Sequence, residues 1–141
     1  MNLKNVSILF SMFLFSYSFS QLIPSAESRF ENFIAYAKEG SDIFAKEIRK
    51  AQANTYVNSF GDNDDTWITF KSGVLGDSKQ TYKITNVIKR TTNDFITYEI
   101  ESYNVMEPKT RKTIIKFSFV YSESNLKRVI FLTNKYAFEF Y

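Results

Sequence analysis

The stretch FENFIAYAKEGSDIFAKEI, residues 30–48, has apolar residues that fit the period of a helix. Phe30, Phe33 and Ala37 are three and four positions apart, which is the spacing of one helical stripe. Gly40 can end the first segment, and a second amphipathic pattern follows it. We therefore predict two N-terminal helices, as a hairpin or as one long, bent helix.

The residues on both sides of this stretch support the same prediction. Ser25 can cap the free amides of a first turn, and Glu27 favours the positive end of a helix dipole. In the second segment Ile48 and Ala51 share a face with Phe44, while the basic and acidic residues between them face water. Both predicted helices thus present one apolar face.

The rest of the chain is typical of short strands separated by turns. The strands are predicted at residues 66–72, 81–90, 95–105, 112–121, 126–133 and 136–141. Their connections are short, so neighbouring strands should be antiparallel and form a meander. Residues 136–141 would be an edge strand, through which we predict pairing with a second copy as a homodimer.

Period-two alternation gives three of these strands one apolar face. The predicted face consists of Tyr82, Ile84, Ile88, Ile96, Tyr98, Ile100, Ile115, Phe117, Phe119 and Tyr121. Two amphipathic helices are available to cover it. The predicted fold class is α+β, with the N-terminal helices packed on a curved antiparallel meander of about five to six strands.

This order of elements resembles the nuclear transport factor 2-like and cystatin-like architectures over nearly all of residues 21–141. The resemblance implies a cone-shaped pocket between sheet and helices, in a group that includes both enzymes and binding modules. Two features depart from it. Dehydratases of the first group use histidine, which is absent here, and the cystatin QxVxG loop has no match, since the nearest segments are QTYKI at 80–84 and SGVLG at 72–76.

The N-terminus has the layout of a secretory signal, with Lys4 followed by an apolar run at residues 6–19. The run is shorter than the roughly 20 residues that a spanning helix needs. Ser18 and Ser20 supply small residues before a cut that would leave Gln21 first, and this junction resembles Bacteroidota signals. We predict a signal peptide at 1–20 and one domain at 21–141, which would be periplasmic or secreted. The alternatives for the apolar run are a retained N-terminal anchor and a helix that belongs to the fold.

Composition excludes several classes of chemistry. The chain has no His and no Cys. This excludes Ser-His-Asp and Cys-His catalysis, the usual zinc and haem ligands, disulfides and a lipid-modified Cys. No phosphate-binding glycine loop is present. The net charge of +3 is spread along the chain, which argues against nucleic acid. We expect no cofactor, no metal, no assigned catalytic residue and no stable membrane anchor after processing.

Two acidic clusters have simpler explanations than catalysis or calcium binding. If Asp62 is taken as the first position of a calcium loop, Trp67 falls where the loop needs Gly and Gly73 falls where it needs Glu. We therefore interpret residues 62–65 as a turn. Glu99 and Glu101 lie on one face of a strand, but they alternate with the apolar set and should face solvent.

Polar residues on the apolar face suggest a small ligand site. Asn86 interrupts this face in one strand and Ser102 continues it in another. Pockets are mostly apolar with a few polar groups, so we predict a site lined by Trp67, Tyr82, Asn86, Tyr98 and Ser102. The alternative is that Ser102 lies beyond the core and Asn86 at a bulge.

The function predicted from these features is a non-catalytic exported module that binds a small apolar ligand or an envelope protein. One alternative is an isomerase or hydrolase that uses Tyr and a carboxylate of raised pKa in the same pocket. Another is a secreted inhibitor or immunity-type protein, which would form a stable complex with its target.

Overall fold

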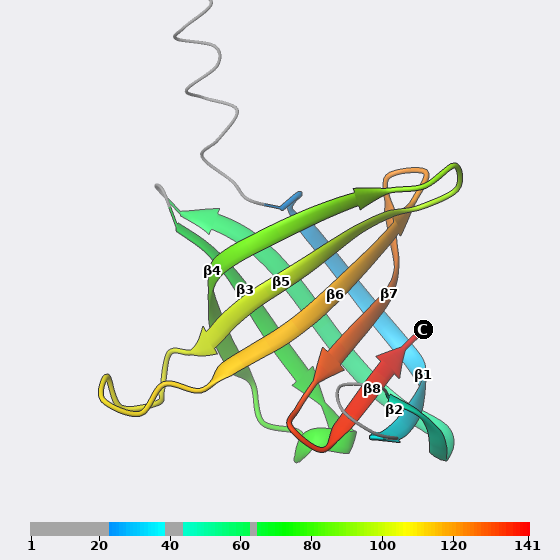
Figure 1. The fold of residues 1–141 in the computed structure, drawn as a ribbon, viewed down its shortest axis with the longest axis horizontal. Helices are drawn as coiled ribbons and strands as arrows, with labels where there is room; N and C mark the ends of the chain where they lie inside the picture. Colours follow the sequence, from blue (N-terminus) through cyan, green and yellow to red (C-terminus); the bar gives the residue numbers. More distant parts are fainter. Residues whose placement is uncertain (1–22, 39–43, 63–64) are drawn as a thin grey trace, which may run out of the picture.

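The computed structural model describes residues 23–38, 44–62 and 65–141, and in these residues the chain forms a closed antiparallel β-barrel (Figure 1). A 3₁₀ turn, Gly73–Leu75, lies between β3 and β4. The strands are β1 Ala26–Lys38, β2 Phe44–Asp62, β3 Asp65–Ser72, β4 Gln80–Thr91, β5 Ile96–Asn104, β6 Ile114–Ser122, β7 Asn125–Leu132 and β8 Tyr136–Phe140.

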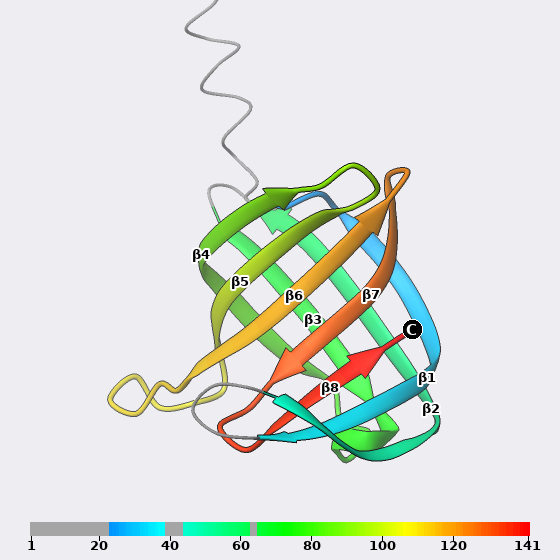
Figure 2. The same cartoon turned by 45° about the vertical axis from the view of Figure 1, so that its right-hand side comes forward.

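The barrel follows chain order around its wall and closes where the last strand meets the first. β8 pairs with β7 on one side and with β1 on the other, from Phe33 opposite Phe140 to Ala37 opposite Tyr136 (Figure 2). Asn32 and Tyr141 extend this seam by exchanging two backbone hydrogen bonds of 3.2 and 3.1 Å. The expectation that residues 136–141 form a free edge for pairing is therefore wrong.

The predicted α+β class is also wrong, and with it the architecture implied by the nuclear transport factor 2-like and cystatin-like resemblance. Residues 26–38 and 44–53, predicted to lie in the two helices, belong instead to the long strands β1 and β2. The β1–β2 register shifts between Phe30 and Asn32, and the next buried position of β1 after Phe30 is Phe33. This bulge in the β1–β2 ladder explains the three-residue spacing from Phe30 to Phe33, which matches the period of a helix.

The second predicted helical face fails for a related reason. Ile48 is 50% exposed in β2, and its basic and acidic neighbours are exposed as well. The inward residues of β2 lie further along, at Thr55, Val57 and Ser59, which alternate as a strand requires. Small hydroxyl side chains at two of these positions gave the sequence little apolar signal.

The six strands predicted after residue 65 are confirmed to within two residues at each end. With the exception of Ile88, which faces solvent, their predicted apolar faces point into the barrel and pack against the opposite wall, so no helix is needed to cover them. In β5 and β6 the inward residues pair directly, Ile100 opposite Phe117 and Tyr98 opposite Phe119. All four of these side chains are buried.

Aromatic rings fill the middle of the barrel. Phe70 stacks on Phe131 with 5.5 Å between ring centroids, and meets Phe117 and Phe140 edge-on at 5.9 and 5.3 Å. Tyr82 packs edge-on against Phe117 at 5.1 Å. Offset and edge-to-face contacts of this kind add about 0.5–1.5 kcal/mol per pair to the free energy of burial. An eight-stranded barrel is just wide enough for such a filled interior.

Candidate functional site

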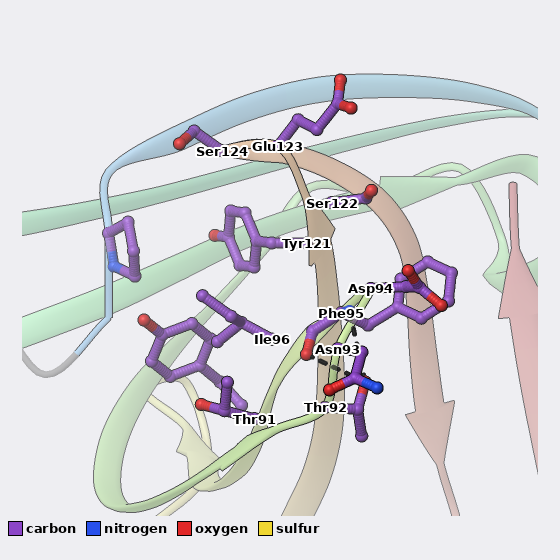
Figure 3. A pocket seen from close by; sticks show the side chains of 12 residues that line it. Thr91, Thr92, Asn93, Asp94, Phe95, Ile96, Tyr121, Ser122, Glu123 and Ser124 are labelled. Atoms are coloured by element: carbon purple, nitrogen blue, oxygen red, sulfur yellow. Dashed lines mark hydrogen bonds between the residues drawn. The ribbon is translucent and has the colours of Figure 1, made fainter.

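A cavity of about 700 Å³ opens at the end of the barrel formed by the β4–β5 and β6–β7 turns (Figure 3). It is lined by Pro24, Thr91, Thr92, Asn93, Asp94, Phe95, Ile96, Tyr98, Tyr121, Ser122, Glu123 and Ser124. We call it the mouth cavity. It lies above the aromatic core.

The floor of the mouth cavity is aromatic because two neighbouring strands direct their inward residues to it. Ile96 of β5 pairs with Tyr121 of β6, and Tyr98 follows two positions along on the same face. The rings of Tyr98 and Tyr121 meet edge-on with centroids 5.6 Å apart, and both side chains are buried. The floor therefore offers two phenol rings and an isoleucine to a ligand.

The rim is made by two turns with defined hydrogen bonds. In the β4–β5 turn the Thr92 amide donates to the Phe95 carbonyl at 2.8 Å, and the Phe95 amide donates to the Thr92 hydroxyl at 3.2 Å. In the β6–β7 turn Glu123 and Ser124 have φ of 52° and 66°, the left-handed conformation common at tight turns. The rim carries the exposed carboxylates Asp94 and Glu123 and several hydroxyls, together with the exposed ring of Phe95.

The Tyr121 hydroxyl is buried and has no hydrogen-bond partner of good geometry among the described residues. Burial raises the pKa of Tyr121 to about 12. The nearby Ser59 hydroxyl lowers this pKa, and the nearby Tyr98 raises it. The group therefore stays protonated at neutral pH. Its oxygen is buried, so an acceptor in the mouth cavity would reach it only after a small shift of the floor side chains.

The first described residues of the chain close one side of the mouth cavity. Ile23 is buried in the core, and Pro24 lines the cavity. The Ser59 hydroxyl fixes this segment, since it donates to the Pro24 carbonyl and accepts from the Ala26 amide, both at 2.9 Å. β2 thus holds the start of β1 in place beside the cavity.

Of the predicted ligand residues, Tyr98 lines the mouth cavity and the other four do not. Tyr82 lies in the aromatic core, and Ser102 is buried where its hydroxyl donates to the Ile115 carbonyl at 2.9 Å. Trp67 lies on the outer wall, opposite Lys83 of β4, whose ammonium is 5.5 Å from the centroid of the Trp67 ring. The structure does not bring these residues together. Ser20 and Gln21, the predicted cleavage site, lie outside the described residues.

Asn86 is exposed because of a bulge in β4. The β4–β5 register shifts between Ile84 and Asn86, so alternation restarts one residue later and Val87 turns inward. Asn86 and Ile88 consequently face solvent, and Ile88 is 48% exposed. The bulge that the sequence analysis kept as an alternative is present.

Sequence reasoning missed Tyr121 and the two turns as cavity residues. A usable signal existed, because Tyr121 ends the apolar set of β6 directly before a polar turn. What could not be seen was the closure of the barrel. The β4–β5 and β6–β7 turns already lie at the same end of neighbouring strands, and closure adds Pro24 beside them around one opening.

A second, more polar hollow of about 710 Å³ lies against β1, β2 and β3. It contains Tyr56, with the Arg29 guanidinium 5.7 Å from the ring, and the exposed ion pair Lys71–Asp77 at 3.9 Å. The charged side chains that line this hollow are both acidic and basic. We call it the side groove.

The described residues show no arrangement typical of metal binding or of carboxylate catalysis. No group of potential metal ligands occurs among them, and their buried polar side chains are all hydroxyls. Asp65, from the predicted turn at 62–65, pairs with Lys83 at 3.2 Å, and Glu99 pairs with Arg90 at 2.9 Å. Residues 63–64 of that turn lie outside the description. No helix in the described ranges is long and apolar enough to span a membrane.

Comparison of the chain with protein-family models, curated proteins and solved structures gave no match. The mouth cavity is therefore interpreted from its own residues.

Proposed function

We propose that this chain is an exported, non-catalytic module that binds a small, mostly apolar ligand in the mouth cavity. The observation that carries the proposal is the pair of buried phenol rings, Tyr98 and Tyr121, at the floor of an open cavity, where the buried Tyr121 hydroxyl has no hydrogen-bond partner of good geometry among the described residues. A volume of about 700 Å³ is within the usual range for small-ligand sites, which also favour the mouths of barrels.

The residues also indicate the chemistry of the ligand. The floor accepts an apolar or aromatic body, and the Tyr121 hydroxyl favours a hydrogen-bond acceptor such as a carbonyl or ether oxygen. The rim can bond to further polar groups through Thr91 and Ser122. A concave site of this kind suits a small molecule better than a protein, because stable protein interfaces need roughly 800 Å² on each partner.

Catalysis by Tyr and a carboxylate has less support. Burial raises the pKa of both Tyr82 and Tyr121 to about 12, whereas a tyrosine base would need a lowered pKa. A tyrosine–carboxylate hydrogen bond does occur, from Tyr36 to Glu139 at 3.3 Å. It lies on the outer wall, where burial and the Glu139 charge both raise the pKa of Tyr36.

The test is binding of N-phenyl-1-naphthylamine, a neutral apolar probe whose fluorescence rises in apolar sites. We expect saturable binding that Thr91→Trp abolishes by filling the mouth cavity from its exposed rim. Asn54→Trp adds the same volume to the exposed side groove and should leave binding unchanged. Binding lost only in Asn54→Trp, or absent from the unmodified protein, would overturn the proposal.

A further inference from the structure

The connection between β5 and β6, residues 105–113, projects from the barrel wall as a distinct loop (Figures 1 and 2). Internal hydrogen bonds define its shape. The Arg111 amide donates to the Pro108 carbonyl at 2.9 Å, and the Glu107 carboxylate accepts from the Thr113 amide at 2.7 Å. We call residues 105–114 the basic loop.

The basic loop exposes apolar side chains at two points. Met106 is 82% exposed in the loop, and Ile114, the first residue of β6, is 60% exposed. Ile114 is opposite Tyr103 of β5, and the Lys112 ammonium is 3.5 Å from the centroid of the Tyr103 ring. Apolar, aromatic and cationic groups thus lie together at one projection.

The same loop has an excess of positive charge. Lys109, Arg111 and Lys112 are exposed, and among the described residues no ion pair occupies any of them. The acid within the loop, Glu107, is engaged by the Thr113 amide. None of the three cations is thus neutralised by a carboxylate among the described residues, and all three stay exposed to an anionic partner, Lys112 with its ammonium over the Tyr103 ring.

We propose that the basic loop binds reversibly to the surface of a bilayer that contains anionic lipid. Cations beside exposed Met and Ile match an anionic headgroup layer above an apolar interior. A soluble polyanion would use the cations but would not need Met106 and Ile114. A protein partner would need a broad complementary face, whereas a fluid surface can accommodate a narrow projection.

This inference is independent of the mouth cavity, and co-sedimentation with phosphatidylcholine vesicles, with and without phosphatidylglycerol, tests it. The full chain is expressed and its processed form is used; any retained N-terminal segment is common to all variants. Binding should require phosphatidylglycerol. Each Lys or Arg near such a surface contributes about fivefold, so Lys109→Ser, Arg111→Ser and Lys112→Ser together should weaken binding about a hundredfold.

A matched variant separates this site from net charge. Lys46→Ser, Lys50→Ser and Lys127→Ser change the net charge equally at exposed positions outside the loop, and should leave most binding intact. Equal losses in both triple variants, or no binding to phosphatidylglycerol vesicles, would overturn the proposal.

A second pair of variants tests the apolar contact. Met106→Ser should weaken vesicle binding about tenfold, whereas Ile88→Ser, at an exposed site on β4, should not. Loop-dependent binding to heparin without vesicle binding would assign the loop to soluble polyanions and overturn the lipid proposal. Unchanged circular dichroism and Tm would show that each variant is folded.

Discussion

Replacing Tyr121 by Phe tests the floor of the mouth cavity in detail. The substitution keeps the buried ring and removes a hydroxyl that has no hydrogen-bond partner of good geometry among the described residues. A buried polar group without a partner costs about 1–3 kcal/mol. Because Ser59 is near enough to offset part of this cost, we expect Tyr121→Phe to stabilise the free protein by about 1 kcal/mol. For a domain of this size, that corresponds to a rise in Tm of about 4 °C.

The assay is urea unfolding of the ligand-free protein, with Tyr136→Phe as the control. Tyr136 is exposed, so loss of its hydroxyl should change the free energy of unfolding by less than about 0.5 kcal/mol. A loss of about 1 kcal/mol in Tyr121→Phe would refute the reasoning, because it would show that the hydroxyl makes a net stabilising bond in the free protein. The same variant should bind a ligand that bears a carbonyl acceptor about three- to tenfold more weakly.

Three further predictions follow from the core and the N-terminal contacts. Burial raises the pKa of Tyr82 and Tyr121 from 10.0 to about 12, so the native state keeps protons that the unfolded state loses. The contribution of these two tyrosines to the free energy of unfolding should be complete below pH 10. Between pH 10 and 12 it should fall by about 1.4 kcal/mol per pH unit for each tyrosine. Urea unfolding of Tyr82→Phe should show a shallower fall with pH, and an unchanged slope would contradict the assignment. Ser59→Ala removes the bonds to Pro24 and Ala26 and should cost about 1–2 kcal/mol with faster hydrogen exchange at the Ala26 amide; equal exchange would count against this role. Phe117→Ala should lower the free energy of unfolding by about 3–5 kcal/mol in the same assay, and a loss below 1 kcal/mol would contradict a filled core.

The sequence predicted the second half of this fold well because its strands alternate without long interruptions. In β6 the residues Ile115, Phe117 and Phe119 all point inward, as period-two alternation requires. Short turns then leave little choice but antiparallel neighbours. These local signals need no knowledge of what lies on the other side of the sheet.

The first half could not be predicted in the same way. A bulge between Phe30 and Asn32 breaks the alternation of β1, and the resulting spacing matches a helix. β2 adds exposed charges and small inward hydroxyls such as Thr55 and Ser59, which give no clear strand pattern. Closure depends on pairing between β1 and β8, which are far apart in the sequence.

The same limits apply to the candidate site. Tyr98 was predicted correctly as an inward residue, but its partner at the floor, Tyr121, was assigned only to the core. The bulge at Ile84–Asn86 moved Asn86 to the outer wall. Local periodicity can thus identify inward residues, whereas the residues that share an opening depend on strand register, on bulges and on the closure that brings Pro24 to the cavity.

The most direct test of the account is an amide chemical-shift titration of the ¹⁵N-labelled protein with N-phenyl-1-naphthylamine. The largest shifts are expected in residues 91–96 and 121–124, which surround the mouth cavity. Tyr56 and Lys71 in the side groove should change little. Shifts centred on the side groove, or spread evenly over the barrel, would contradict a ligand site at the mouth.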